Sequence, residues 1–174
     1  MLTLALLMAA GLVQGAPAVP SAPAQQGPWL DLSVGPAFLH RDDTHGLSSG
    51  PLVRLGLGAA LTDFAAGEVW VSGVMQSAPL STPGDTAVAA AGLGARLRLH
   101  RFDPDGKLAL WARVGAGFQG AAAGDARSGP TGFAGAQLLF QPFVQRFALG
   151  LEMEAIGERG AVGFALLPSL RAAL

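Results

Sequence analysis

Apolar and polar side chains alternate along most of the chain after residue 28. In the first such segment Leu30, Leu32 and Val34 share one face, while Asp31 and Ser33 share the other. A period of two is typical of a β-strand, whose successive side chains point to opposite faces. Clusters of turn-forming residues interrupt this alternation repeatedly. The pattern therefore predicts eight strands, at residues 29–39, 52–62, 66–77, 87–101, 108–119, 133–142, 147–157 and 161–174.

The predicted strands have the length of membrane-spanning ones. A strand of about eleven residues, tilted by about 40°, rises roughly 27 Å, close to the height of the apolar band of an outer-membrane barrel. Asp103-Pro104-Asp105-Gly106 is a strong hairpin signal, because Pro presets φ and Asp-Gly accepts a left-handed conformation. We expect short turns on one side, at 62–65, 103–106 and 144–146. On the other side we expect longer loops at 40–50, 78–86 and 120–132, and a short connection at 158–160.

The charged residues inside the predicted strands fall on the less hydrophobic face. Arg54, for example, is out of phase with Val53 and Leu55. The same parity holds for Glu68, Arg96, Arg98, His100, Arg113, Glu152, Glu154 and Arg171. An arginine facing lipid near the bilayer midplane costs about 2 to 4 kcal/mol, so the charged face is predicted to line a barrel lumen. A soluble barrel would need the opposite arrangement, with charge outside and apolar residues inside.

Counting residues from the predicted turns places Arg96 and Arg113 nearly opposite each other, with Glu152 and Glu154 at a similar height. Like charges so close are unfavourable unless acids intervene. We therefore predict a buried ionic network in which the two glutamates bridge the arginines. Its predicted members are Arg54, Glu68, Arg96, Arg98, Arg113, Glu152 and Glu154, with Arg98 slightly nearer the turns.

Two further expectations concern the lumen. Asp31 and Arg171 lie near the turn side of the first and last strands, so they should pair across the seam that closes the barrel. Trp70 and Trp111 have the lumen parity, which favours a plugged barrel over an open pore. The alternative is that the charged residues are simply wetted by water in the lumen.

The phenylalanines offer weaker support for a membrane location. Two groups lie near the opposite ends of the predicted strands, as two interfacial girdles require. The turn-side group is Phe64, Phe102, Phe143 and Phe147, and the loop-side group is Phe38, Phe118 and Phe164.

Composition fits a chain that is covered partly by lipid. Of its 174 residues, 51% are hydrophobic and only 13% are charged, whereas a soluble surface needs roughly a quarter. The net charge of −1 argues against nucleic acid as a partner. The chain has no cysteine, which excludes disulfides and thiolate chemistry.

The N-terminus has the pattern of a secretion signal. An apolar run over residues 2–13 is followed by Ala16-Pro17-Ala18 and Ala22-Pro23-Ala24, either of which offers a small-x-small cleavage pattern. We expect a signal peptide and cleavage region at 1–24, a short linker at 25–28 and the barrel at 29–174. A buried apolar helix is the alternative for the first segment.

Two motifs with catalytic overtones have simpler explanations. Residues 115–120 match the dinucleotide fingerprint G-x-G-x-x-G but lie within a predicted strand, with no helix to receive a phosphate. His40, Asp42, Asp43 and His45, with Ser48 or Ser49, suggest a metal site or a hydrolase, although a solvated loop is the commoner meaning of such a cluster. We predict no catalytic residue, no metal and no cofactor.

Together, the strand number, the loop asymmetry and the last strand resemble the small eight-stranded outer-membrane β-barrels, such as the transmembrane domain of outer-membrane protein A. Leu166, Pro168, Leu170, Ala172 and Leu174 alternate in a way similar to the family's C-terminal assembly signal. The resemblance implies a monomer in the outer membrane of a Gram-negative bacterium, with membrane lipid, lipopolysaccharide and the barrel insertion machinery as partners. It implies a structural or surface-interaction role. A narrow passive channel and a lipid A-modifying enzyme remain as alternatives.

Overall fold

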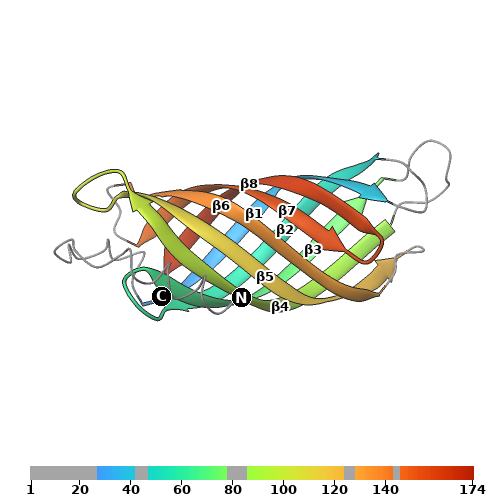
Figure 1. The fold of residues 1–174 in the computed structure, drawn as a ribbon, viewed down its shortest axis with the longest axis horizontal. Coiled ribbons are helices and arrows are strands. Elements are labelled where there is room, and N and C mark those ends of the chain that lie inside the picture. Colours follow the sequence, from blue (N-terminus) through green and yellow to red (C-terminus); the bar gives the residue numbers. More distant parts are fainter. Residues whose placement is uncertain (1–26, 42–46, 78–85, 124–127, 143–145) are drawn as a thin grey trace, which may run out of the picture.

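The computed structural model describes residues 27–41, 47–77, 86–123, 128–142 and 146–174. Each of its eight strands pairs antiparallel with the next one in sequence, and β8 pairs back with β1, so the sheet closes into a barrel (Figure 1). The predicted all-β, up-and-down, eight-stranded barrel is therefore confirmed. The strands are β1 (Pro28–Arg41), β2 (Leu47–Ala60), β3 (Ala65–Gln76), β4 (Thr86–Arg101), β5 (Leu108–Ala123), β6 (Gly129–Phe140), β7 (Phe147–Glu158) and β8 (Ala161–Ala173).

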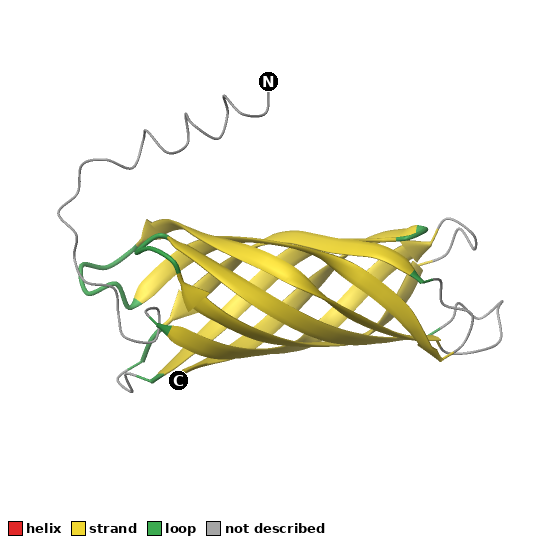
Figure 2. Cartoon of the chain, turned by 90° about the horizontal axis from the view of Figure 1, so that it is seen from below, coloured by secondary structure: helices red, strands yellow, loops and turns green. Residues whose placement is uncertain are grey.

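The barrel has two distinct ends (Figure 2). At one end, called the turn end here, the strands are joined at 61–64, 102–107 and 141–146. The first and last strands also meet there, since the Leu174 N–H donates to the Pro28 carbonyl at 3.0 Å. The opposite end, the loop end, holds the connections at 42–46, 77–85, 124–128 and 159–160.

The lengths predicted for the loops at 40–50 and 120–132 are wrong, because the strands extend into both. β2 begins at Leu47, β5 continues to Ala123 and β6 begins at Gly129. The Ser, Gly and Ala residues in these stretches are typical of loops, but pairing with neighbouring strands extends the ladder through them. The difference in length between loops and turns is consequently smaller than predicted.

The alternation of the sequence becomes the two faces of the wall. Large apolar side chains project outward, including Leu93, Val114 and Met153, whose side chains are half or more exposed. Eight charged side chains of the strand interiors point into the lumen and are buried: Asp31, Arg54, Glu68, Arg96, Arg113, Glu152, Glu154 and Arg171. Two of the predictions concern residues that the structure does not describe. They are Phe143, which was expected at the turn-side rim, and the signal peptide expected at 1–24.

One residue breaks the predicted parity. The register between β4 and β5 shifts between Arg98 and His100, which pairs His100 with the outward-facing Leu110. The His100 ring is exposed and lies edge-on to Phe102, with ring centroids 4.8 Å apart. Its expected place in the lumen is wrong because a bulge inserts one extra residue and reverses the faces beyond it.

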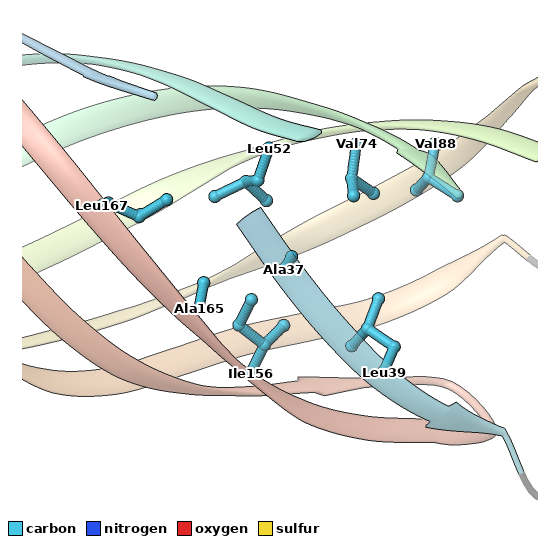
Figure 3. Packing of buried hydrophobic residues seen from close by; sticks show 8 residues of the cluster. All are labelled: Ala37, Leu39, Leu52, Val74, Val88, Ile156, Ala165 and Leu167. Carbon is cyan, nitrogen blue, oxygen red and sulfur yellow. The ribbon is translucent and has the colours of Figure 1, made fainter. Parts of the chain in front are cut away.

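Three layers of inward-facing side chains follow one another along the lumen. Along β7 the inward-facing residues run Ala148, Glu152, Glu154 and Ile156 from the turn end to the loop end. Ala148 packs with Ala109, Trp111 and Leu139 in a turn-side apolar layer. Ile156 belongs to a loop-side apolar layer with Ala37, Leu39, Leu52, Val74, Val88, Ala165 and Leu167 (Figure 3). The charged residues lie between the two.

In the part of the chain that the structure describes, no helix is long and apolar enough to cross a membrane.

Candidate functional site: the ionic layer of the lumen

Every strand of the barrel contributes a polar side chain to the middle of the lumen. Four acids and four arginines balance in charge, and Gln137 of β6 lies among them. The set, called the ionic layer here, consists of Asp31, Arg54, Glu68, Arg96, Arg113, Gln137, Glu152, Glu154 and Arg171. All nine are buried, with at most 5% of any residue exposed.

Glu68 binds the two arginines that face each other on β4 and β5. Arg96 and Arg113 are register partners. The Arg96 Nε donates to Glu68 Oε2 at 2.6 Å, and the Arg113 Nε donates to Glu68 Oε1 at 2.7 Å. One carboxylate therefore neutralises the repulsion between two adjacent guanidinium groups.

The glutamates of β7 hold the other side of the layer. Glu154 makes a bidentate pair with Arg54 of β2, with both N–H···O distances at 2.6 Å. Glu152 accepts a bond from Arg113 Nη1 at 2.5 Å and lies 3.8 Å from Arg54 Nη1. Residues distant in sequence are thus joined directly across the lumen.

The closing seam is part of the same network. Asp31 and Arg171 are register partners of β1 and β8, and Arg171 Nη2 lies 3.2 Å from Asp31 Oδ2. The same carboxylate oxygen accepts a bond from Arg96 Nη1 at 2.9 Å. Gln137 Oε1 accepts bonds from Arg96 at 2.7 Å and Arg171 at 3.1 Å.

Two aromatic rings cover the guanidinium groups. Trp29 lies against Arg96 and Arg171, with ring-to-guanidinium distances of 4.3 and 4.4 Å. Phe133 lies 3.9 Å from the Arg54 guanidinium and 5.1 Å from that of Arg113. Such contacts are attractive because the ring face is electron-rich and the guanidinium group is positively charged.

The structure places eight of the nine predicted site residues in the layer and Arg98 outside it. Arg98 lies nearer the turn end, half-buried, with its guanidinium 5.6 Å from the Trp111 ring. The partner choice also differs from the prediction. Glu152 lies between Arg113 and Arg54 and Glu154 binds Arg54, but Glu68 joins Arg96 to Arg113.

Three members of the site were not singled out from the sequence: Trp29, Phe133 and Gln137. Trp29 has the same parity as Asp31 on β1, and this alternation alone would have predicted that its side chain faces the lumen. Phe133 and Gln137 share the inward face of β6, which carries no charged side chain to mark it.

A cavity of about 20 Å³ lies on the loop side of the ionic layer, between Arg54, Ser72, Trp70 and Phe133, with Glu158 among its lining. This is room for about one water molecule. The arrangement can hold charge in place within the lumen.

The residues with catalytic overtones do not form a site among the described residues. Ser48 is 2% exposed and faces the lumen, where its hydroxyl donates to the Leu39 carbonyl at 3.2 Å. His40 is exposed and lies on the opposite face of the wall. Asp42, Asp43 and His45 lie outside the described residues.

The fingerprint-like run at 115–120 lies inside β5, as predicted. A Cβ at Gly115 would overlap the Phe133 ring, so this glycine makes room for an aromatic side chain.

Solved structures with the same fold are small outer-membrane barrels. Neisserial surface protein A matches with a TM-score of 0.67 and 12% identity, over 86% of this chain and 98% of that one. Ail, the attachment invasion locus protein of Yersinia pestis, matches with a TM-score of 0.54 and 17% identity, over 84% of this chain and 99% of that one. A structure of Ail in a phospholipid bilayer nanodisc matches with a TM-score of 0.52 and 13% identity, over 84% and 99%. No protein-family model and no curated protein matches the chain. The fold is that of the small eight-stranded outer-membrane β-barrels.

Proposed function

We propose that this chain is an integral outer-membrane barrel with a structural or surface-interaction role, and that the ionic layer plugs its lumen. Two features support the membrane location. The outer wall carries exposed Leu, Val, Met and Phe side chains on every strand, and the fold matches barrels from bacterial outer membranes. Among the described residues, Asp, Glu, Lys and Arg lie in the lumen or at the barrel ends, as the cost of charge in lipid requires.

The filled lumen carries the proposal. Two apolar layers enclose the ionic layer, and the cavity beside it has room for about one water molecule. A passive channel needs a continuous water path. Ion pairs between four acids and four arginines instead join seven strands, and Gln137 joins β6 to them, so the role of the ionic layer is to fix the barrel in one closed form.

Single-channel recording on the refolded protein in planar bilayers tests the plug. Slower migration on heated than on unheated denaturing gels first confirms that the barrel has folded, because its closed ladder resists detergent until heated. We expect no stepwise conductance from the folded protein. Regular steps that scale with salt concentration would favour the narrow-channel alternative.

The orientation is proposed with the loop end outside the cell. A tag inserted at 124–128 should be labelled on intact cells, whereas a tag at 103–107 should be labelled only after lysis. The reverse pattern would contradict the orientation. Export by a signal peptide, insertion by the barrel insertion machinery and contact with lipopolysaccharide belong to this proposal, with a monomer as the expected form.

The proposal includes no enzymatic activity. Overexpression should leave the mass spectrum of lipid A unchanged, and a new lipid A species that disappears with the Ser48→Ala variant would favour the enzyme alternative instead.

A further inference from the structure

Two Gly-Pro dipeptides mark the base of the loop-end part of the β1–β2 hairpin. They are Gly35-Pro36 on β1 and Gly50-Pro51 on β2, and Pro36 is the register partner of Pro51. The part beyond them, residues 36–41 and 47–51, is called the hairpin tip here. Pairing within the tip is regular as far as His40 and Leu47. The two prolines therefore lie on one line across an otherwise intact hairpin.

The ladder to β8 is interrupted at this line. Pairing stops at Ser33 with Ser169 and resumes at Ala37 with Ala165. Residues of an antiparallel strand direct their N–H groups alternately to the two neighbours, and the bond from Leu174 N–H to Pro28 places the even residues of β1 toward β8. Pro36 consequently lacks the donor that would face β8, and Pro168 lacks the donor that would face Val34.

The ladder to β3 is broken at the same height. Regular pairing begins only at Leu52 with Val74, and an isolated bridge between Ser49 and Ser77 lies beyond the break. The bond from Ser77 N–H to the Ser49 carbonyl, at 3.2 Å, places the odd residues of β2 toward β3. Pro51 therefore lacks the donor that would face Met75. The Ser48 hydroxyl, whose proton is shared with the Leu39 carbonyl, also lies 3.3 Å from Gln76 Oε1.

Glycine is required where the neighbouring backbones cross this line. A Cβ at Gly35 would overlap the Leu166 carbonyl oxygen, and a Cβ at Gly50 would overlap that of Met75. On the outer face a groove of about 370 Å³ follows the same line, lined by Val34, Gly35, Pro36, Phe38, Ser49, Gly50 and Pro51. The missing N–H donors, the close backbone contacts and the groove all lie at the Gly35-Pro36 and Gly50-Pro51 line. A few such residues, weakly bonded to the neighbouring strands, are typical of a hinge.

We infer that the hairpin tip is a hinged lid over the loop end of the lumen, bending at the Gly35-Pro36 and Gly50-Pro51 line. Its inward side chains are Ala37, Leu39 and Ser48, and Leu39 is 1% exposed within the loop-side apolar layer. The edge toward β3 opens first, because regular pairing there ends at Leu52 with Val74 and, among the described residues, an isolated bridge takes its place beyond that point. The edge toward β8 stays attached through renewed pairing and the Phe38–Phe164 stack, whose centroids are 5.0 Å apart. Opening uncovers the loop-side layer, whether or not the barrel conducts.

Hydrogen exchange of the folded barrel in nanodiscs, followed by mass spectrometry, tests the lid. Residues 37–41 and 47–50 should exchange at least 10-fold faster than 129–133 and 154–158, which lie equally close to the loop end. Pro51→Ala restores a donor toward Met75, and one added hydrogen bond should slow exchange of the tip about 5- to 10-fold. Pro130→Ala, on β6 and away from the hinge, is the matched control and should leave the tip unchanged.

A disulfide lock provides a second readout, which is clean because the chain has no cysteine. Ser49→Cys with Ser77→Cys joins register partners across the opening edge, at a spacing that a disulfide can bridge. Oxidation should slow exchange of 47–50 to the rate of 154–158, and reduction should restore it. Equal exchange of the tip and the reference segments in the unmodified protein, or slowing by Pro130→Ala as much as by Pro51→Ala, would overturn the lid. Gel mobility tests folding separately, so a failure of the lid is distinct from a failure of the barrel or its plug.

Discussion

Arg96 and Arg113 face each other as register partners on β4 and β5, and their guanidinium groups share the Glu68 carboxylate. Asp31 also pairs with Arg96 and Glu152 with Arg113, but the Glu68 carboxylate lies between the two like charges and compensates both. The pair therefore makes Glu68 the acid on which the layer depends most, because no other acid contacts both arginines at such short distances among the described residues.

Glu68→Gln should consequently destabilise the barrel by about 3 to 5 kcal/mol, since it leaves two facing arginines with less compensation. Urea titration of refolded protein in detergent measures the change. Asp105→Asn removes a carboxylate from an exposed pair with Lys107, 3.2 Å apart, and should cost no more than about 1 kcal/mol. Equal effects from the two variants would show that the ionic layer behaves like solvated surface charge.

The sequence could predict which side chains face the lumen because lipid makes the parity strict. An arginine on the wrong face would cost several kcal/mol, so the alternation around Arg54 and Arg113 leaves one assignment. The Asp31–Arg171 contact also follows from counting, because both residues lie near the same end of adjacent strands.

Partner choice across the lumen could not be predicted in this way. Arg54 on β2 meets Glu154 on β7 because the strands tilt and the register staggers around the barrel. Steps from a turn give height along one hairpin but not the position of a distant strand. The outward position of His100 could not be predicted for a related reason. One bulged residue in β4 reverses the face of every residue that follows it in the strand.

Trp29→Leu should destabilise the barrel by about 2 to 4 kcal/mol, because leucine fills part of the site but offers no π face to the two arginines. Trp29→Phe keeps an aromatic face and should cost clearly less. The free energies of unfolding of both variants, compared with the unmodified protein, provide the measurement. A leucine variant as stable as the phenylalanine variant would indicate that Trp29 acts by volume alone.

Asp103 should give the β4–β5 turn a dependence on pH. Its Oδ1 accepts the Leu108 N–H at 2.7 Å and its Oδ2 accepts the Lys107 N–H at 2.9 Å. Burial alone would raise the pKa of Asp103, but these backbone hydrogen bonds and the Lys107 charge prevail and lower it. A carboxyl whose pKa is lower in the folded state contributes its stability above the unfolded value of about 3.9 and loses it as the pH falls through the folded value.

Asp103→Ala should therefore cost about 1 kcal/mol at pH 7 and less at pH 2. Chemical denaturation of both proteins at the two pH values isolates this group, because all other carboxyls are common to the pair. The same difference at both pH values would contradict a role for the ionised carboxylate.

The glycines of the run at 115–120 should respond differently to the same substitution. A Cβ at Gly115 would overlap the Phe133 ring and lie 2.9 Å from Trp70 Nε1, whereas a Cβ at Gly120 would meet no atom within 4 Å. Phe133 cannot retreat easily, because it packs against Trp70 and against the guanidinium groups of Arg54 and Arg113. Gly115→Ala should cost about 1 to 3 kcal/mol through overpacking, and Gly120→Ala should change stability by no more than about 0.5 kcal/mol. Unfolding titrations of the two variants decide the matter, and similar losses would mean that the Phe133 ring does not occupy the space beside Gly115.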